Sequence, residues 1–146
     1  MNEIAEIING TLHSGIPVEI TEYSIDSRSV VTPEHTLFFA LTGNNHNGHD
    51  YIRTLYTDGV RAFVISEFRE EFNQLTDANF IVVENVLTAL QQLAAHHRQH
   101  TQAEVIGITG SNGKTVVKEW LYQLLANDHA VYRSPRSYNS QVGVPL

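Results

Sequence analysis

The feature that most constrains the fold of this chain is a glycine-rich loop between a β-rich run and an amphipathic segment. Residues 105–120 read VIGITGSNGKTVVKEW, and the apolar residues after Lys114 and Thr115 recur at helical spacing. A strand, a glycine loop and a helix start bring backbone N–H groups and the positive helix end together, which makes an anion site. The alternatives are an ordinary strand-to-helix turn, or a hairpin turn at Asn112-Gly113, which the helical period downstream disfavours. The sequence therefore predicts a phosphate-binding loop.

The loop departs by one residue from the standard P-loop pattern, G-x-x-x-x-G-K-[ST]. Counted back from Gly113, the first glycine should occupy the position of Ile108, whereas glycines lie on either side of it. In a P-loop the lysine reaches the β- and γ-phosphates of a nucleotide, and the hydroxyl residue holds Mg²⁺. These two roles fall here to Lys114 and Thr115.

Strand and helix patterns alternate along the chain, which predicts an α/β fold class. Strands are expected at 36–41, 61–66, 79–84, 104–109 and 129–134, and helices at 4–8, 50–59, 86–100 and 116–125, with a short acidic helix between the second and third strands. We expect a domain boundary near Glu84. Residues 1–84 then form a small N-terminal domain, and residues 85–146 hold a connector helix and the truncated start of a second domain, a βαβ unit that carries the glycine loop.

Composition and charge exclude several classes of function. The formal net charge is −7, and the nine lysines and arginines are scattered along the chain, so no basic face for nucleic acid is expected. No apolar run approaches the roughly 20 residues needed to span a bilayer, and the first residues lack the layout of a signal peptide, so we expect a cytoplasmic protein that does not bind membranes. The absence of cysteine excludes disulfides, thiolate catalysis and Cys-based zinc sites.

Two pairs of histidines need an interpretation. His96 and His100 are four residues apart on a predicted helix, a spacing that metal ligands use, but no acidic third ligand is near them in the sequence. Their position near the negative end of the helix explains them more simply. His46 and His49 are expected on a solvated loop. The histidines therefore predict no zinc site.

ITGSNGKT, residues 108–115, resembles the T-G-[ST]-x-G-K-T loop of the Mur ligases, the ATP-dependent amide ligases of peptidoglycan synthesis. That family also lacks the first P-loop glycine, so the mismatch becomes a point of agreement. YNSQVGVPL, residues 138–146, resembles the later N-x-x-x-G-x-P segment of the family. The resemblance implies ATP and Mg²⁺ as cofactors, Lys114 as a catalytic residue and Thr115 as the Mg²⁺ ligand. The implied ATP-binding residues are Gly110, Ser111, Asn112, Gly113, Lys114, Thr115, Val116 and Asn139.

Three positions depart from the family pattern. Val116 stands where a second threonine is usual, and Ser140 and Gln141 stand where asparagine and glutamate are common. The first departure affects a secondary phosphate contact, and the other two affect expected substrate contacts.

Two upstream stretches extend the resemblance over nearly the whole chain. IDSRSV (25–30) and LFFALTGNNHNGHDYI (37–52) resemble the N-terminal UDP-binding domain of the Mur ligases that add the third peptide residue and the terminal dipeptide. The match implies a pocket for uridine and diphosphate, lined by Ser27, Asn44, Asn45 and His46. Each stretch also has a simpler interpretation, as a turn that ends a strand and as a turn at Asn47-Gly48.

The resemblance implies an ATP-dependent amide ligase that acts in cell-wall synthesis, and so in cell shape and division. KEWLYQLL and SPRSYNSQVGVPL are most similar to the members that add D-alanyl-D-alanine to UDP-MurNAc-tripeptide through an acyl phosphate, some of which are fused to an alanine racemase. We expect an N-terminal portion of such a ligase, a monomer that binds these small molecules but does not ligate them. The alternatives are a sibling amide ligase, adding the third peptide residue or acting on folates, and a non-catalytic nucleotide-binding module.

Overall fold

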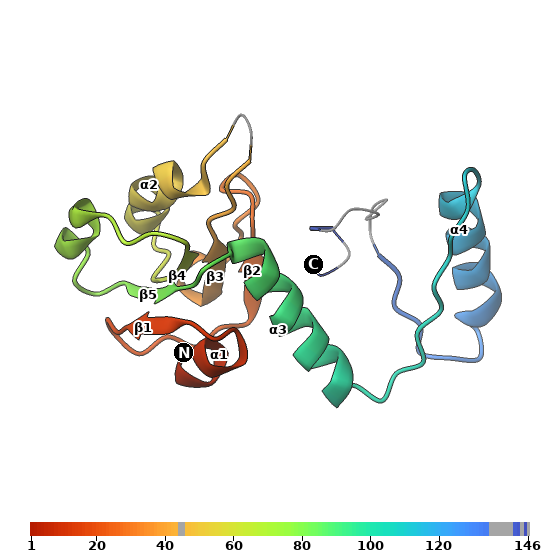
Figure 1. Cartoon of the computed structure of the whole chain (residues 1–146). Helices are drawn as coiled ribbons and strands as arrows, with labels where there is room; N and C mark the ends of the chain where they lie inside the picture. The colour runs from red at the N-terminus through yellow and green to blue at the C-terminus, as the bar shows by residue number, and fades with distance from the viewer. Residues whose placement is uncertain (44–45, 135–141, 144, 146) are drawn as a thin grey trace. The chain divides into compact units, whose positions relative to one another are not determined.

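The computed structural model of the chain describes residues 1–43, 46–134, 142–143 and 145 (Figure 1). The chain divides into two compact units, one built on Met1–His100 and the other on Thr101–Val144, and each is described by itself. This division lies beyond the boundary expected near Glu84, because helix α3 (Val86–His100) packs within the first unit. Within the described residues, no helix is both long enough and apolar enough to cross a membrane.

The first unit is an α/β structure built around a five-stranded sheet with the order β1-β5-β4-β3-β2. Strands β2 to β5 are parallel, and β1 pairs with β5 in the antiparallel direction. The strands are β1 (Thr11–His13), β2 (Glu22–Ser24), β3 (Thr36–Phe39), β4 (Ala62–Ile65) and β5 (Asn79–Val82). Besides α3, the described helices are α1 (Asn2–Ile7), α2 (Ile52–Thr57) and the 3₁₀ helices η1 (Pro33–His35), η2 (Gly48–Tyr51) and η3 (Glu70–Gln74).

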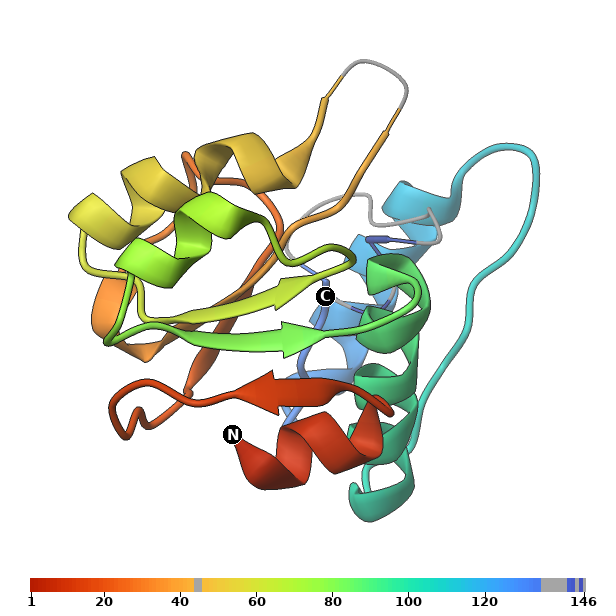
Figure 2. The same cartoon turned by 60° about the vertical axis from the view of Figure 1, so that its left-hand side comes forward.

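The central strands are buried on both faces, as parallel strands covered by helices must be. Every residue of β3 and β4 is buried. On one face an aromatic row crosses three strands, because Phe38 is in register with Phe63, and Phe63 with Phe80. The rings of Phe63 and Phe80 stack with their centroids 5.3 Å apart, and Phe38 meets Phe63 edge-on at 6.5 Å. Residues of α2 and η3 join this cluster, and α1 and α3 lie on the opposite face of the sheet (Figure 2).

The structure confirms most elements predicted for this unit. The strands predicted at 36–41, 61–66 and 79–84 and the helices predicted at 50–59 and 86–100 are present, with ends that differ by a few residues. The short acidic helix is the 3₁₀ helix η3. The strands β1 and β2 escape prediction because each has three residues and lies at an edge of the sheet, where burial imposes little pattern.

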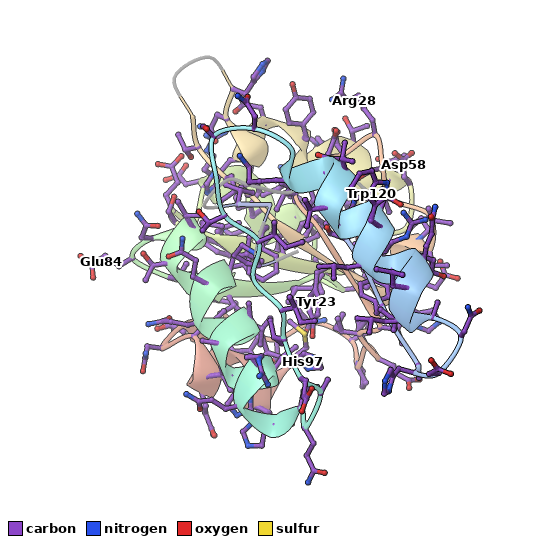
Figure 3. All side chains as sticks on the ribbon, turned by 90° about the vertical axis from the view of Figure 1, so that its right-hand side faces the viewer. Tyr23, Arg28, Asp58, Glu84, His97 and Trp120 are labelled. Carbon is purple, nitrogen blue, oxygen red and sulfur yellow. The ribbon has the colours of Figure 1, made fainter. Side chains whose placement is uncertain are left out.

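The second unit contains helix α4 (Lys114–Leu125), which confirms the helix predicted after the glycine loop. The strands predicted at 104–109 and 129–134 are wrong, because neither segment is a strand in the structure. A strand needs backbone hydrogen bonds to a neighbouring strand, and the described residues of this unit supply no such ladder. Helix α4 buries none of its residues, and Trp120 (labelled in Figure 3) is 63% exposed.

Gly48 closes the loop that follows β3 by packing directly on the sheet backbone. A Cβ atom at this position would lie 2.6 Å from the Cα atom of Ala40 and 2.7 Å from its carbonyl carbon. The Gly48 N–H also donates to the Leu41 carbonyl oxygen at 2.8 Å. Only glycine can approach the backbone this closely, so the position of the loop depends on it.

Gly48→Ala is therefore expected to lower the free energy of unfolding by about 1–3 kcal/mol, since the backbone of Ala40 and Leu41, just after β3, must shift to admit the methyl group. Urea unfolding, followed by far-UV circular dichroism, measures this change. Gly43→Ala in the same loop is the matched control, because its Cβ would meet only the His46 carbonyl oxygen, at 3.9 Å, and a change within about 0.5 kcal/mol is expected. Equal effects of the two substitutions would contradict the close-approach argument.

Candidate functional site

A hollow of about 420 Å³ opens at the carboxyl ends of β2 and β3. Ligands of parallel α/β sheets bind outside the carboxyl ends of the strands, so this is the expected place for a site. The hollow is bounded by the turn after β2, by β3, by the loop after β3 and by η2. Its lining residues are Ile25, Asp26, Ser27, Arg28, Phe38, Leu41, His46, Gly48 and Tyr51.

The hollow brings together two of the residues predicted to bind substrate. Ser27 comes from the turn after β2 and His46 from the loop after β3. The predicted Asn44 and Asn45 lie outside the described residues. Tyr51, on η2, was not predicted as a site residue, although it lies within the quoted motif, because no local pattern in the sequence shows that η2 returns to this hollow.

Arg28 and Asp26 form a bidentate ion pair at the rim of the hollow. The Arg28 Nε–H donates to Asp26 Oδ1 at 2.9 Å, and an NH2 hydrogen donates to Oδ2 at 2.8 Å. The Arg28 hydrogen bonds lower the pKa of Asp26 to about 2, so the carboxylate stays ionised at every physiological pH. The Arg28 side chain is 87% exposed and projects from the ribbon (Figure 3), which leaves the guanidinium accessible to an anionic ligand.

The turn that presents Ser27 is held by its own backbone and by two serines. Ser24, at the end of β2, donates through its hydroxyl to the Asp26 carbonyl oxygen at 3.0 Å. The Ser29 hydroxyl donates to the same oxygen at 2.9 Å, and the Ser29 N–H at 3.0 Å. The Ser27 side chain has no hydrogen-bond partner among the described residues, so it can bind a ligand without breaking a protein contact.

His49 lies behind the hollow and is not the solvated residue that the sequence predicts. Its side chain is buried, with 2% of the residue exposed. One ring nitrogen, Nδ1, lies 2.8 Å from Asn47 Oδ1, and the other, Nε2, accepts from the Ser66 N–H at 3.1 Å. Burial lowers the pKa of His49, and the nearby Arg69 cation lowers it further. His49 is therefore a neutral group that connects the loop to the end of β4.

The glycine loop of the second unit forms a separate candidate site. Gly110 has φ +142° and Gly113 has φ +80°, and such positive values favour glycine. Gly113 caps the N-terminus of α4. Among the described residues, no acceptor takes the backbone N–H groups of Ser111, Asn112 and Gly113. Free N–H groups at the start of a 12-residue helix are the arrangement that binds phosphate.

Lys114 closes over this loop. Its ammonium group donates to the Gly110 carbonyl oxygen at 2.5 Å. Thr115 follows Lys114 in the first turn of α4. Val116 is half exposed and brings no polar group, and the predicted Asn139 lies outside the described residues. Residues 110–115 thus carry backbone donors, the Lys114 cation and the hydroxyls of Ser111 and Thr115.

The helix histidines contact each other near the end of α3. His96 and His100 lie with their ring centroids 4.3 Å apart, and the Nδ1 atom of His100 lies 2.8 Å from the His96 carbonyl oxygen. In the described part of the chain, no three His, Cys, Asp or Glu side chains come together as a metal site.

Known proteins resemble this chain over its whole length. The UDP-N-acetylmuramoyl-tripeptide–D-alanyl-D-alanine ligase of Bacillus subtilis is 32% identical over 146 residues, which are all of this chain and 32% of that protein. The ligase of the same name from Synechocystis is 37% identical over 88% of this chain and 27% of its own length. The chain therefore spans about a third of the length of the curated relatives it matches.

Solved structures and a family model give the same assignment. MurF from Acinetobacter baumannii superposes with a TM-score of 0.86 at 27% identity, over 99% of this chain and 31% of that one. MurF ligase from Thermotoga maritima, solved in complex with ADP, gives 0.71 at 30% identity, over 86% and 28%. The family model described as "Mur ligase family, catalytic domain" matches residues 19–98, more than half of the chain. The chain therefore belongs to the Mur ligase family.

Proposed function

We propose that this chain is the part of an ATP-dependent amide ligase that binds the UDP end of UDP-MurNAc-tripeptide and the phosphates of ATP, for ligation of the tripeptide to D-alanyl-D-alanine. The names of the curated relatives support this reaction over that of the sibling ligases. The observation that carries the proposal is the hollow at the carboxyl ends of β2 and β3, which gathers Ser27 and His46. We place the reaction in the cytoplasm, in a monomer.

The hollow has the groups that a uridine diphosphate needs. The aromatic ring of Tyr51 and the apolar side chains of Ile25 and Leu41 suit the faces of a uracil base. The free Ser27 hydroxyl and His46 suit its polar edge or the phosphates. Arg28 supplies an exposed cation, and it can turn from Asp26 toward a diphosphate because its side chain is free on the outer side.

The glycine loop suits the polyphosphate of ATP. The three free N–H groups of residues 111–113 would take phosphate oxygens, and Lys114 would exchange the Gly110 carbonyl oxygen for a phosphate oxygen. The ADP complex of the Thermotoga maritima relative supports a nucleotide site in this family. The Thr115 hydroxyl fits Mg²⁺, which binds through few protein groups beside the phosphates, and such an ion would neutralise charge on the γ-phosphate.

The reaction needs two steps. A carboxylate oxygen of the tripeptide attacks the γ-phosphorus of ATP, so that ADP leaves and an acyl phosphate forms. The amine of D-alanyl-D-alanine then attacks the acyl carbon, phosphate leaves, and the amine loses a proton as the amide forms. Lys114 would offset the charge that builds on the transferred phosphoryl group, a contribution made by position and electrostatics.

Lys114→Ala is expected to weaken ATP binding by about 10- to 100-fold, because a charge-assisted hydrogen bond to phosphate contributes about 1.5–3 kcal/mol. Isothermal titration calorimetry with Mg·ATP measures the loss. Lys118→Ala on the same helix is the matched control, since the Lys118 ammonium donates to the Ser134 carbonyl oxygen rather than to the loop. Binding that survives Lys114→Ala unchanged would point to a different nucleotide site.

UDP-N-acetylglucosamine is expected to bind the first unit without ATP, and Ser27→Ala to weaken it about 3- to 10-fold through the loss of one hydrogen bond. Ser14→Ala is the control, because Ser14 is an exposed serine outside the hollow. Chemical-shift changes in a ¹⁵N–¹H spectrum should cluster at residues 25–28 and at His46. A folded sample that gives no shifts there would overturn the assignment of the hollow.

The 146-residue chain is expected to bind these ligands without joining them, since it spans about a third of the length of the relatives that carry the ligase name. Incubation with ATP, UDP-MurNAc-tripeptide and D-alanyl-D-alanine, followed by mass spectrometry, should show no dipeptide addition. Formation of the pentapeptide product would show that this chain alone holds the whole catalytic machinery.

A further inference from the structure

His49 is a buried titratable side chain that takes no part in the proposed ligand contacts. It is 2% exposed, yet both of its ring nitrogens have polar partners. It lies on η2, between the loop that lines the hollow and the end of β4. A buried imidazole with two fixed partners has a restricted protonation state, and the partners identify that state.

Two backbone N–H groups determine the protonation state of the ring, because they can only donate. The Ser66 N–H points to Nε2 at 3.1 Å, so Nε2 is an acceptor and carries no proton. The His49 backbone N–H points to Asn47 Oδ1 at 3.1 Å, so that atom is the amide oxygen rather than the nitrogen. The ring atom Nδ1, 2.8 Å from the same oxygen, must then donate. His49 is therefore neutral, with its proton on Nδ1.

The ring holds the stem of the loop. Asn47 Oδ1 accepts from both donors of His49 and also from the Thr42 hydroxyl, at 3.4 Å. Thr42 and Asn47 face each other across an isolated β-bridge, and the Gly43 N–H donates to the His46 carbonyl oxygen at 2.8 Å. These contacts set the position of His46, which lines the hollow.

We propose that neutral His49 is a positioning residue that holds the bridged pair Thr42 and Asn47, the stem of the loop, against the end of β4, and that protonation of its ring releases this stem and weakens ligand binding in the hollow. The expected effect on ligand binding rests on the proposed function. The expected release of the stem does not depend on it. A proton added to Nε2 would face the Ser66 N–H, so two donors would meet and that hydrogen bond would be lost beside a buried charge. The Ser66 hydroxyl, 3.5 Å from Nε2, lies at the limit of hydrogen-bond distance and offers only a weak replacement.

Three charged groups act on the ring from the elements around it. Arg69, before η3, opposes protonation, whereas Glu67, after β4, and Asp50, on η2, favour it. Arg69 is itself paired with both carboxylates, at 2.8 Å and 2.9 Å, which limits their effect. Burial is the dominant influence and lowers the pKa of His49. The stem is therefore fully held above the ordinary histidine pKa of about 6.5 and loosens as the pH falls below that value.

The first experiment observes the ring directly in the whole chain. A long-range ¹H–¹⁵N spectrum at pH 7.5 should show His49 protonated at Nδ1 and unprotonated at Nε2. As the pH falls below 6.5, the amide signals of Asn47, Gly48 and Ser66 should shift together with the His49 ring. A ring protonated at Nε2, or one that titrates while those amides stay fixed, would overturn the proposal.

The second experiment measures the affinity for UDP-N-acetylglucosamine between pH 7.5 and 5.5. This probe is chosen because both of its phosphates are esterified and keep their charge over that range. Wild-type affinity should fall in step with protonation of the His49 ring, by at least about threefold once the ring is mostly protonated, and the fall should be absent in His49→Gln, which keeps polar groups at the site but cannot gain a proton. His129→Gln, which changes an exposed histidine of the second unit, should keep the wild-type profile.

The outcomes separate the two proposals. A rise in affinity in acid would contradict the role given to His49. An affinity that stays constant while the ring spectrum changes would also contradict this role of His49. If the probe does not bind at any pH, the proposed function fails. The ring spectrum of the wild-type chain still decides whether His49 holds the stem, and it does so even if His49→Gln does not fold.

Discussion

The aromatic row of Phe38, Phe63 and Phe80 is the interaction on which the arrangement of the first unit depends. Parallel strands are held in register by the side chains that they bury, and a slip of one residue would turn each ring to the opposite face of the sheet. The row aligns β3 with β4 and β5, and Ser24 of β2 lies in register with Phe38. Because of this alignment, β2 and β3 end at the same level, and the segments after them meet. Phe38 itself reaches the hollow, so the core and the site share a side chain.

The two candidate sites are built in different ways. At the hollow and in the loop beside it, side chains are placed by polar contacts with one another and with the backbone. Examples are the Asp26–Arg28 pair at the rim and the hydrogen bonds that join His49 to Asn47 and Ser66 next to it. The glycine loop instead offers backbone N–H groups and the end of a helix dipole, with Lys114 as its one cation. Under the proposed function, the first arrangement would recognise a base and sugar, and the second would bind a phosphate chain whatever it is attached to.

The sequence predicted the features that depend on local patterns and missed those that depend on contacts between distant segments. The buried strands β3, β4 and β5 and the helices α3 and α4 were predictable because continuous apolar runs and helical spacing are local patterns. The segments before the glycine loop (104–109) and after α4 (129–134) were predicted as strands because their residues favour β structure, but a strand also requires a neighbour for its backbone hydrogen bonds. The environment of His49 was also predicted wrongly. The Asn47-Gly48 turn beside it suggested a solvated loop, and the Ser66 contact that buries it comes from a distant segment.

By itself, the sequence determined the α/β alternation and a resemblance to the Mur ligases that the comparisons with known proteins confirm, and it predicted a phosphate-binding loop at residues 110–115. Those properties depend on which residues follow one another, and local spacing is enough to express them. Tertiary structure alone decided that Ser27, His46 and Tyr51 share one hollow, that Arg28 is paired with Asp26 at its rim, and that His49 is buried, neutral and protonated on Nδ1. The physical reason is that these properties arise where strand ends meet, and the register of the sheet decides which strand ends are neighbours.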